Sequence, residues 1–182
     1  MLLCGCTNLK HIREKEENVS TTSPPVATTG MLIRKPVGVV FRAFIDPAIT
    51  THFWFTESTG PLAPNASVTW TWGMYGAAGD VVVRDFEPDC RVRFEWGGET
   101  PNQVEWTFTP LADNRTFVDI RNWDFAGSNE EQTAAAIDAT GGFSLVLAGA
   151  KAWLEHNLEL NLVRDRFPKD LGPHGDEHRG NQ

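Results

Sequence analysis

Cysteine and positive charge are both scarce in this sequence. Three cysteines occur in 182 residues: Cys4 and Cys6 lie near the N-terminus, and Cys90 falls between predicted strands. Cysteines in these places make no disulfide framework, which is typical of a reducing compartment, so we expect a cytoplasmic protein. Sixteen Lys and Arg against 24 Asp and Glu give a net charge of −8. We therefore expect no nucleic-acid partner and no docking on anionic membrane, because both need clustered positive charge.

Membrane-length apolar runs and familiar catalytic motifs are also missing. No apolar run reaches the roughly 18 residues of a membrane span. The chain has no G-x-S-x-G or H-E-x-x-H motif, no phosphate-binding loop and no dinucleotide fingerprint, so we expect no catalytic residue and no cofactor. Cys4 and Cys6 with His11 offer neither a fourth ligand nor the spacing of a zinc site, and no metal site is expected.

The composition is nevertheless that of a chain with a globular core. Hydrophobic residues make up 41%, and seven tryptophans against one tyrosine predict a bulky, mostly apolar interior. The length fits one domain plus tails. Residues 1–30 are charged and then Ser/Thr/Pro-rich, and residues 168–182 are polar, so we expect a disordered leader and a disordered tail around a domain at 31–167.

A long amphipathic helix is predicted over residues 141–166. Apolar residues recur there with the helical period at Phe143, Leu147, Ala150 and Leu154. The pair Gly141-Gly142 is predicted to break any helix before it, including the weakly helical residues 130–139, and Pro168 is predicted to end the helix. Such a helix needs a sheet to cover its apolar face.

Short strands precede this helix. Apolar and polar residues alternate, as in half-buried strands, at residues 68–74, 81–86, 91–96, 104–109 and 118–121. Before them we expect a strand at 31–35, a helix at 37–45, and a second short helix with Asp46 as its N-cap and Pro47 at its first position. In the hairpin of the 91–96 and 104–109 strands, the register that sets Arg93 opposite Glu105 is preferred, because the other would oppose Glu95 and Glu105.

This order predicts an α+β fold of the helix-grip type, with a curved antiparallel sheet wrapped around the long C-terminal helix and two short helices after the first strand. Residues 31–166 resemble the branch of the START/SRPBCC superfamily called activator of heat-shock-protein-90 ATPase homologue-like. The resemblance rests on the order and spacing of several stretches: Arg34-Lys35-Pro36, residues 39–47, Trp54-Phe55-Thr56 with Thr59-Gly60, Phe94-Glu95-Trp96, and Gly142-Phe143 leading through Leu147, Leu154 and Glu155. Two positions depart from it, because the family often has Trp at Phe143 and His at Asn122.

The resemblance implies a cavity between the sheet and the long helix that binds a small apolar molecule. The large side chains on the inward strand faces and on the apolar helix face, next to small residues, are suited to line such a cavity. They could equally fill a solid core. The candidate ligand-binding residues are Trp54, Trp70, Trp72, Met74, Phe94, Trp96, Trp106, Ile120, Asn122, Phe143, Val146, Leu147 and Ala150.

Two other functions remain open at this point. The superfamily includes polyketide cyclases and aromatases, and chemistry of that kind would need polar cavity residues, for which His52, Arg84 and Asn122 are the candidates. Arg84 would enter the cavity only if Val82 and Phe86 point inward, and it would be exposed if Val81 and Val83 do. The third function is a co-chaperone-like protein-interaction module or homodimer. An open cavity favours binding or catalysis, and a filled core favours protein interaction.

Overall fold

A computed structural model describes residues 23–168 of the chain. The expected leader up to residue 22, with Cys4, Cys6 and His11, and the expected tail from residue 169 lie outside the described residues. The elements, in chain order, are β1 (Ala27–Ile33), α1 (Val37–Ile45), α2 (Pro47–Thr50), β2 (Glu57–Ser58), β3 (Ser67–Trp72), β4 (Ala77–Glu87), β5 (Arg91–Trp96), β6 (Asn102–Leu111), β7 (Arg115–Trp123), α3 (Asn129–His156) and α4 (Leu162–Asp165).

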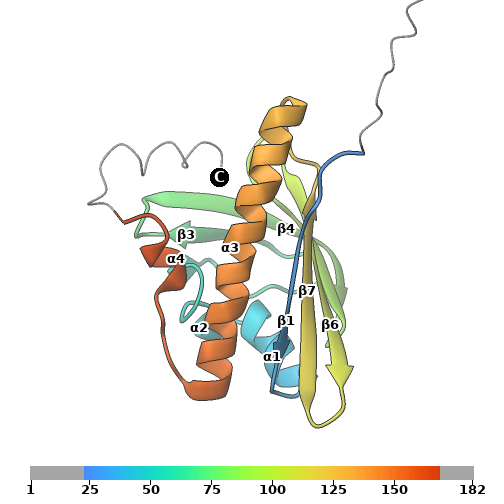
Figure 1. Cartoon of the computed structure of the whole chain (residues 1–182), viewed down its shortest axis with the longest axis vertical. Helices are drawn as coiled ribbons and strands as arrows, with labels where there is room; N and C mark the ends of the chain where they lie inside the picture. The colour runs from blue at the N-terminus through green and yellow to red at the C-terminus, as the bar shows by residue number, and fades with distance from the viewer. Residues whose placement is uncertain (1–22, 169–182) are drawn as a thin grey trace, which may run out of the picture.

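The seven strands form one antiparallel sheet in the order β1-β7-β6-β5-β4-β3-β2. The sheet curves around α3, which runs alongside β1, while α1 and α2 close one end (Figure 1). The core lies between the inner face of the sheet and α3. The predicted α+β helix-grip fold is therefore confirmed.

Strand alternation places the expected side chains in the core. Trp70 and Trp72 of β3 are buried, and Arg93 faces Glu105 across β5 and β6 as predicted. On β4, Val81 and Val83 point inward, and a bulge follows between Val83 and Asp85. Arg84 therefore lies on the outer face, where its Nη2 donates to the Glu95 carboxylate at 2.6 Å.

The long helix differs from its predicted bounds at both ends. It begins at Asn129, because the Ser128 hydroxyl accepts the N–H of Glu131 and the Glu131 carboxylate accepts the N–H of Ser128, which is a capping box. It ends at His156 because Asn157 takes a left-handed conformation (φ 58°) and its N–H bonds back to the carbonyl of Trp153. Residues 162–165 form the separate helix α4.

The predicted break at Gly141-Gly142 is wrong, because both glycines lie inside α3. The guanidinium of Arg166 lies against them: a Cβ added at Gly141 or Gly142 would be 3.0 or 2.9 Å from its Nη atoms. The glycines thus make room for α4 and the residue that follows it, at some cost in helix propensity.

The predicted bounds of several strands also differ: β4, β6 and β7 are longer than predicted, the first strand is displaced, and the 68–74 strand is shorter at its end. The first strand runs Ala27–Ile33 instead of 31–35, since Ala27 is buried and pairs with Asn122 of β7. The strand expected at 68–74 ends at Trp72, because the chain turns at residues 73–76 with Gly76 at a positive φ of 67°. The short helix α2 forms as predicted, with the Asp46 carboxylate accepting the N–H of Ala48.

By length and composition alone, α3 would qualify as a membrane-spanning helix, the only one among residues 23–168. Its position in the fold gives its apolar face another role. Phe143, Val146, Leu147 and Ala150 are buried against the rest of the core. It is the core helix of the helix-grip fold.

Candidate functional site

Five tryptophans gather in the core to form what we call the tryptophan cluster. They come from the segment after α2 and from strands β3, β5 and β6. The Trp70 and Trp106 rings are parallel within 2° at 6.2 Å, the Trp72 and Trp96 rings stack at 5.7 Å, and Trp54 lies 4.7 Å from Trp70. The members of the cluster are Trp54, Trp70, Trp72, Trp96 and Trp106.

The long helix closes over this cluster. The Phe143 ring meets Trp54 edge-on at 5.8 Å and Trp96 at 5.9 Å, so α3 and the sheet are joined through aromatic contacts. Every predicted apolar site residue belongs to this core or, for Met74 and Trp96, packs against it partly exposed. The structure thus brings the predicted set together, and the side chains occupy the space between sheet and helix. Whether they touch a ligand stays a prediction.

One polar atom in the cluster has no partner. Trp106 is fully buried, and its indole Nε1–H has no hydrogen-bond acceptor within the described part of the chain. Leaving such a donor unpaired costs about 1–3 kcal/mol. An acceptor atom on a bound water or on a ligand would satisfy this donor.

Asn122 is buried as its strand phase predicts, but its amide is occupied. Its Nδ2 donates to the Asn102 side-chain oxygen at 2.7 Å and to the Gln103 carbonyl at 2.8 Å. These bonds tie β7 to the start of β6. The Asn122 amide therefore holds strands β7 and β6 together.

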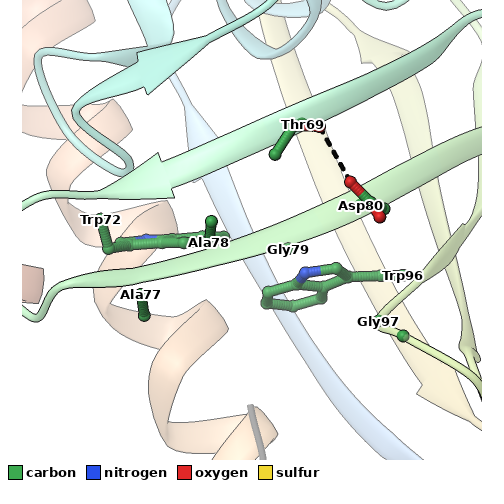
Figure 2. Close-up of a pocket in the computed structure, with 9 residues that line it drawn as sticks. Thr69, Trp72, Ala77, Ala78, Gly79, Asp80, Trp96 and Gly97 are labelled. Carbon is green, nitrogen blue, oxygen red and sulfur yellow. Dashed lines mark hydrogen bonds between the residues drawn. The ribbon is translucent and has the colours of Figure 1, made fainter.

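A surface pocket of about 220 Å³ borders the tryptophan cluster, and we call it the edge pocket. It exists because β4 is longer than β5: the last pair is Val81 with Trp96, so residues 77–79 extend beyond β5. Figure 2 shows the indoles of Trp72 and Trp96 beside this stretch, with Gly79 between them. The pocket is lined by Thr69 and Trp72 of β3, residues 77–80 of β4, and residues 96–98.

A second pocket, of about 410 Å³, lies between the β3–β4 turn and α4. It is lined by Met74 and Tyr75, by Arg164 and Asp165, and by residues 167–168. Of the predicted ligand residues it contains Met74 alone, while the edge pocket contains Trp72 and Trp96. The predicted set therefore reaches the surface at two separate places.

The sequence reasoning missed the other residues of the edge pocket. Gly79, Asp80 and Gly97 line it, and none of them was a candidate. The available signal was the glycine doublet 97–98 directly after a strand, together with a glycine inside the neighbouring strand, where glycine often marks close approach.

His52, the other candidate for proton transfer, is bound elsewhere. Its Nδ1 hydrogen-bonds the Glu159 carboxylate, and its ring stacks on Trp153 at 3.8 Å. Together these contacts fasten the segment after α2 to the last turn of α3 and to the residues that follow it. Both partners lie outside the tryptophan cluster.

A buried carboxylate links α3 to the end of β1. Glu155 accepts the N–H of Arg34 at 2.7 Å and a hydrogen bond from Lys151 Nζ at 2.6 Å. Burial opposes ionisation of Glu155, but these bonds and the two positive charges outweigh burial and hold its pKa below the ordinary value. Lys151 Nζ also donates to the Leu32 carbonyl at 2.7 Å.

Comparisons with known proteins agree on the architecture. The family model described as Activator of Hsp90 ATPase homolog 1-like protein matches residues 34–155. No curated protein matches the chain.

Solved structures are similar in fold at low identity. Protein SSP2350 from Staphylococcus saprophyticus is 23% identical, with a TM-score of 0.65 over 75% of this chain and 96% of that one. The Aha1 dimer from Colwellia psychrerythraea is 14% identical, with a TM-score of 0.63 over 72% and 97%. DynU16, from the dynemicin biosynthetic locus, is 21% identical, with a TM-score of 0.61 over 74% of this chain and 48% of its own.

Proposed function

We propose that this chain, which belongs to the Activator of Hsp90 ATPase homolog 1-like family, binds a small hydrophobic molecule between its sheet and α3. The proposed site is the tryptophan cluster with the buried face of α3. The single observation that carries the proposal is the unpaired Nε1–H of Trp106. A ligand with one acceptor in an otherwise apolar body would satisfy this donor and bury its surface against the rings.

Binding at this site requires the core to rearrange. The rings and the α3 side chains fill the interior, so a ligand must displace some of them. The cluster is closest to solvent at Trp96, which is only partly buried and lines the edge pocket. A ligand that entered beside Trp96 would leave the contacts between α3 and β1 undisturbed. We place the protein in the cytoplasm, as its cysteine usage suggests.

Native mass spectrometry of the freshly purified protein is the direct test. We expect a mass excess that disappears on denaturation and that corresponds to a molecule extractable into organic solvent. The same spectrum gives the oligomeric state. A protein that shows only its chain mass and that also fails to bind the neutral apolar dye N-phenyl-1-naphthylamine would contradict the proposal.

A pair of variants on α3 locates the site. Leu147 is fully buried and faces the cluster, whereas Ile137 is 70% exposed on the same helix. Leu147→Trp should abolish dye binding, and Ile137→Trp should leave it unchanged. Because Leu147→Trp also overpacks the core, Ala150→Val serves as a smaller change with the same expected direction. Unchanged dye binding in folded Leu147→Trp would place the pocket elsewhere.

A protein-interaction role is the second candidate, favoured by the filled interior. The similar protein from Colwellia psychrerythraea is described as a dimer. A dimer in the native spectrum without any small-molecule mass would move the assignment to this role.

The polyketide cyclase alternative has few polar residues in the core to support it. The polar residues buried as a whole among residues 23–168 are Thr50, Thr116 and Asn122, and Cys90 is exposed.

A further inference from the structure

Trp54 lies at the centre of the tryptophan cluster. Its ring centroid is 4.7–6.3 Å from those of the four other members, Trp70, Trp72, Trp96 and Trp106. It is also 5.8 Å from the ring of Phe143 on α3. The interplanar angles of these five pairs lie between 56° and 89°, so the Trp54 ring meets its neighbours tilted or edge to face and stacks on none of them.

Trp54 reaches this place from outside the sheet. The four other members are on β3, β5 and β6 and form a wall of rings on the inner face of the sheet, while Phe143 is on the helix that covers this face. Trp54 belongs to the segment between α2 and β2, and its ring contacts both the wall and Phe143. It therefore fills the space between sheet and helix. A ligand that binds there must take the place of this ring.

The backbone on either side of Trp54 is held firmly. The Phe55 ring stacks on Trp70 at 4.9 Å with an interplanar angle of 20°. Phe53 packs so closely against α3 that a Cβ added at Gly149 would be 3.0 Å from the Phe53 Cβ. Because residues 53 and 55 are fixed in this way, rotation of the Trp54 side chain about its own bonds is the movement that frees its place. Such a rotation breaks no backbone hydrogen bond of the sheet or of α3.

The place of the Trp54 ring lies between the proposed entry and the unpaired donor. Trp96 is partly exposed, lines the edge pocket and meets Trp54 edge-on at 6.0 Å. Trp106, whose buried Nε1–H has no acceptor among residues 23–168, is 5.7 Å from Trp54. A molecule that passes Trp96 and replaces the Trp54 ring therefore arrives beside this donor.

We propose that the ligand is a planar aromatic molecule with one hydrogen-bond acceptor, which takes the place of the Trp54 ring while this side chain rotates away. The proposal rests on the interior site proposed above and names the class of its ligand. Aromatic rings have a negative face and a positive edge, and the rings around Trp54 stand in the tilted and edge-on arrangements that aromatic pairs prefer. A flat ligand of the size of indole meets the same surroundings, whereas a flexible alkyl chain does not.

Two ketones test the class of the ligand. 1-Indanone is flat and of the size of indole, and 2-nonanone carries the same number of carbon atoms and the same acceptor on a flexible chain. Each is titrated into protein that has bound N-phenyl-1-naphthylamine, and the loss of dye fluorescence is measured. Because each aromatic pair adds to the affinity beyond the area it buries, we expect 1-indanone to displace the dye at a concentration about tenfold lower. Equal or stronger displacement by 2-nonanone would overturn the proposal.

The replacement of Trp54 is tested by NMR on the unaltered chain. The indole N–H signals of ¹⁵N-labelled protein are recorded with and without the dye, and those of Trp54 and Trp70 are assigned from Trp54→Phe and Trp70→Phe. We expect dye binding to bring the Trp54 N–H into rapid exchange with water while the Trp70 N–H stays protected. A Trp54 N–H that stays protected in the dye-bound protein would overturn the proposal.

Removal of the Trp54 ring provides a second measurement. An apparent Kd is the intrinsic Kd divided by the fraction of binding-competent protein, so a competent fraction below about 10% predicts that Trp54→Ala tightens dye binding about tenfold or more. Phe108→Ala removes a buried ring that packs on Phe41 and Phe44 outside the cluster, and it should give no gain. Trp54→Leu takes the place of Trp54→Ala if the latter does not fold. Unchanged binding in the folded Trp54 variant, or an equal gain in Phe108→Ala, would overturn the proposal.

Failure of this proposal is distinct from failure of the interior site. A native chain that binds the dye but keeps its Trp54 N–H protected contradicts the replacement of Trp54 and leaves the interior site standing. A native chain that binds no dye contradicts the interior site, and this proposal with it.

Discussion

Arg166 and Asp138 form an ion pair across the middle of α3. The guanidinium Nη2 donates to the Asp138 carboxylate at 2.6 Å and to its backbone carbonyl at 3.2 Å. To reach that carbonyl, the side chain lies flat on the helix backbone at Gly141 and Gly142. Two glycines that would weaken an isolated helix here create the contact that fastens α4 to it.

The first prediction concerns the coupling of Gly142 to Arg166. Alanine favours a helix over glycine by about 1 kcal/mol, but its Cβ at position 142 would displace the Arg166 guanidinium. We therefore expect Gly142→Ala to stabilise the Arg166→Ala variant by about 1 kcal/mol and the native chain by clearly less. Urea denaturation of the four proteins of this cycle measures the difference. Equal effects in both backgrounds would show that the two residues do not interact.

Gly149 should respond in the opposite way to the same substitution. An added Cβ would lie 3.0 Å from Phe53 Cβ and 3.3 Å from the Phe53 carbonyl oxygen, and backbone cannot swing aside as an arginine can. We expect Gly149→Ala to destabilise the protein by about 1–3 kcal/mol in spite of its better helix propensity. Thermal unfolding beside Gly142→Ala, on the same helix, provides the control. A stabilised Gly149→Ala would contradict the close approach of α3 to Phe53.

The third prediction is a pH dependence due to Glu155. Because its pKa is lowered on folding, ionised Glu155 stabilises the folded state above the unfolded pKa of about 4.3, and this stabilisation is lost as the pH falls through the lower folded pKa. Glu155→Gln should cost about 1–3 kcal/mol at pH 7 and progressively less below pH 4 or so. Unfolding free energies between pH 3 and pH 7, in steps of about one unit, measure this.

The exposed Glu99 offers a matched control for that experiment, since Glu99→Gln makes the same charge change in the β5–β6 turn. Its effect should be small at every pH. A Glu155→Gln cost that persists undiminished at pH 3 would assign the effect to packing instead of charge.

The fourth prediction follows from the unpaired indole of Trp106. Trp106→Phe and Trp70→Phe both shrink a ring in the buried core, but Trp106→Phe also removes a buried donor that has no acceptor among residues 23–168. We expect Trp106→Phe to cost less stability than Trp70→Phe, by about 1 kcal/mol. Chemical denaturation of ligand-free protein measures both. An equal or greater cost for Trp106→Phe would indicate that its N–H is satisfied, for example by a buried water.

The sequence predicted what depends on short-range pattern. Alternation located the inward faces of β3, β5, β6 and β7 but left that of β4 open. Charge complementarity selected the Arg93–Glu105 register, and Asp46-Pro47 located α2. The sequence did not predict that α3 continues through two glycines, because the glycines accommodate the side chain of Arg166, which lies more than twenty residues later in the chain. Glycine propensity is a weak local preference that tertiary packing overrides.

The candidate site was only partly within reach of the sequence. Periodicity identified side chains that would be buried, such as Phe143 and Leu147, and they are buried. It carries no information on whether neighbouring rings leave a gap, since that depends on rotamers and on the distance between helix and sheet. The edge pocket arises from the unequal lengths of β4 and β5, a difference of strand pairing that no single segment encodes.

Lys151 and Glu155 also bear on how this protein stays apart from other chains. β1 is an edge strand of the sheet, and an uncovered edge is a template for adding a foreign strand. The Lys151 ammonium donates a hydrogen bond to the Leu32 carbonyl, and the Glu155 carboxylate accepts one from the Arg34 N–H. These two side chains, one turn apart on α3, supply the donor and the acceptor that a neighbouring strand would supply. The end of β1 is therefore already hydrogen-bonded and does not offer these two groups to a strand of another chain.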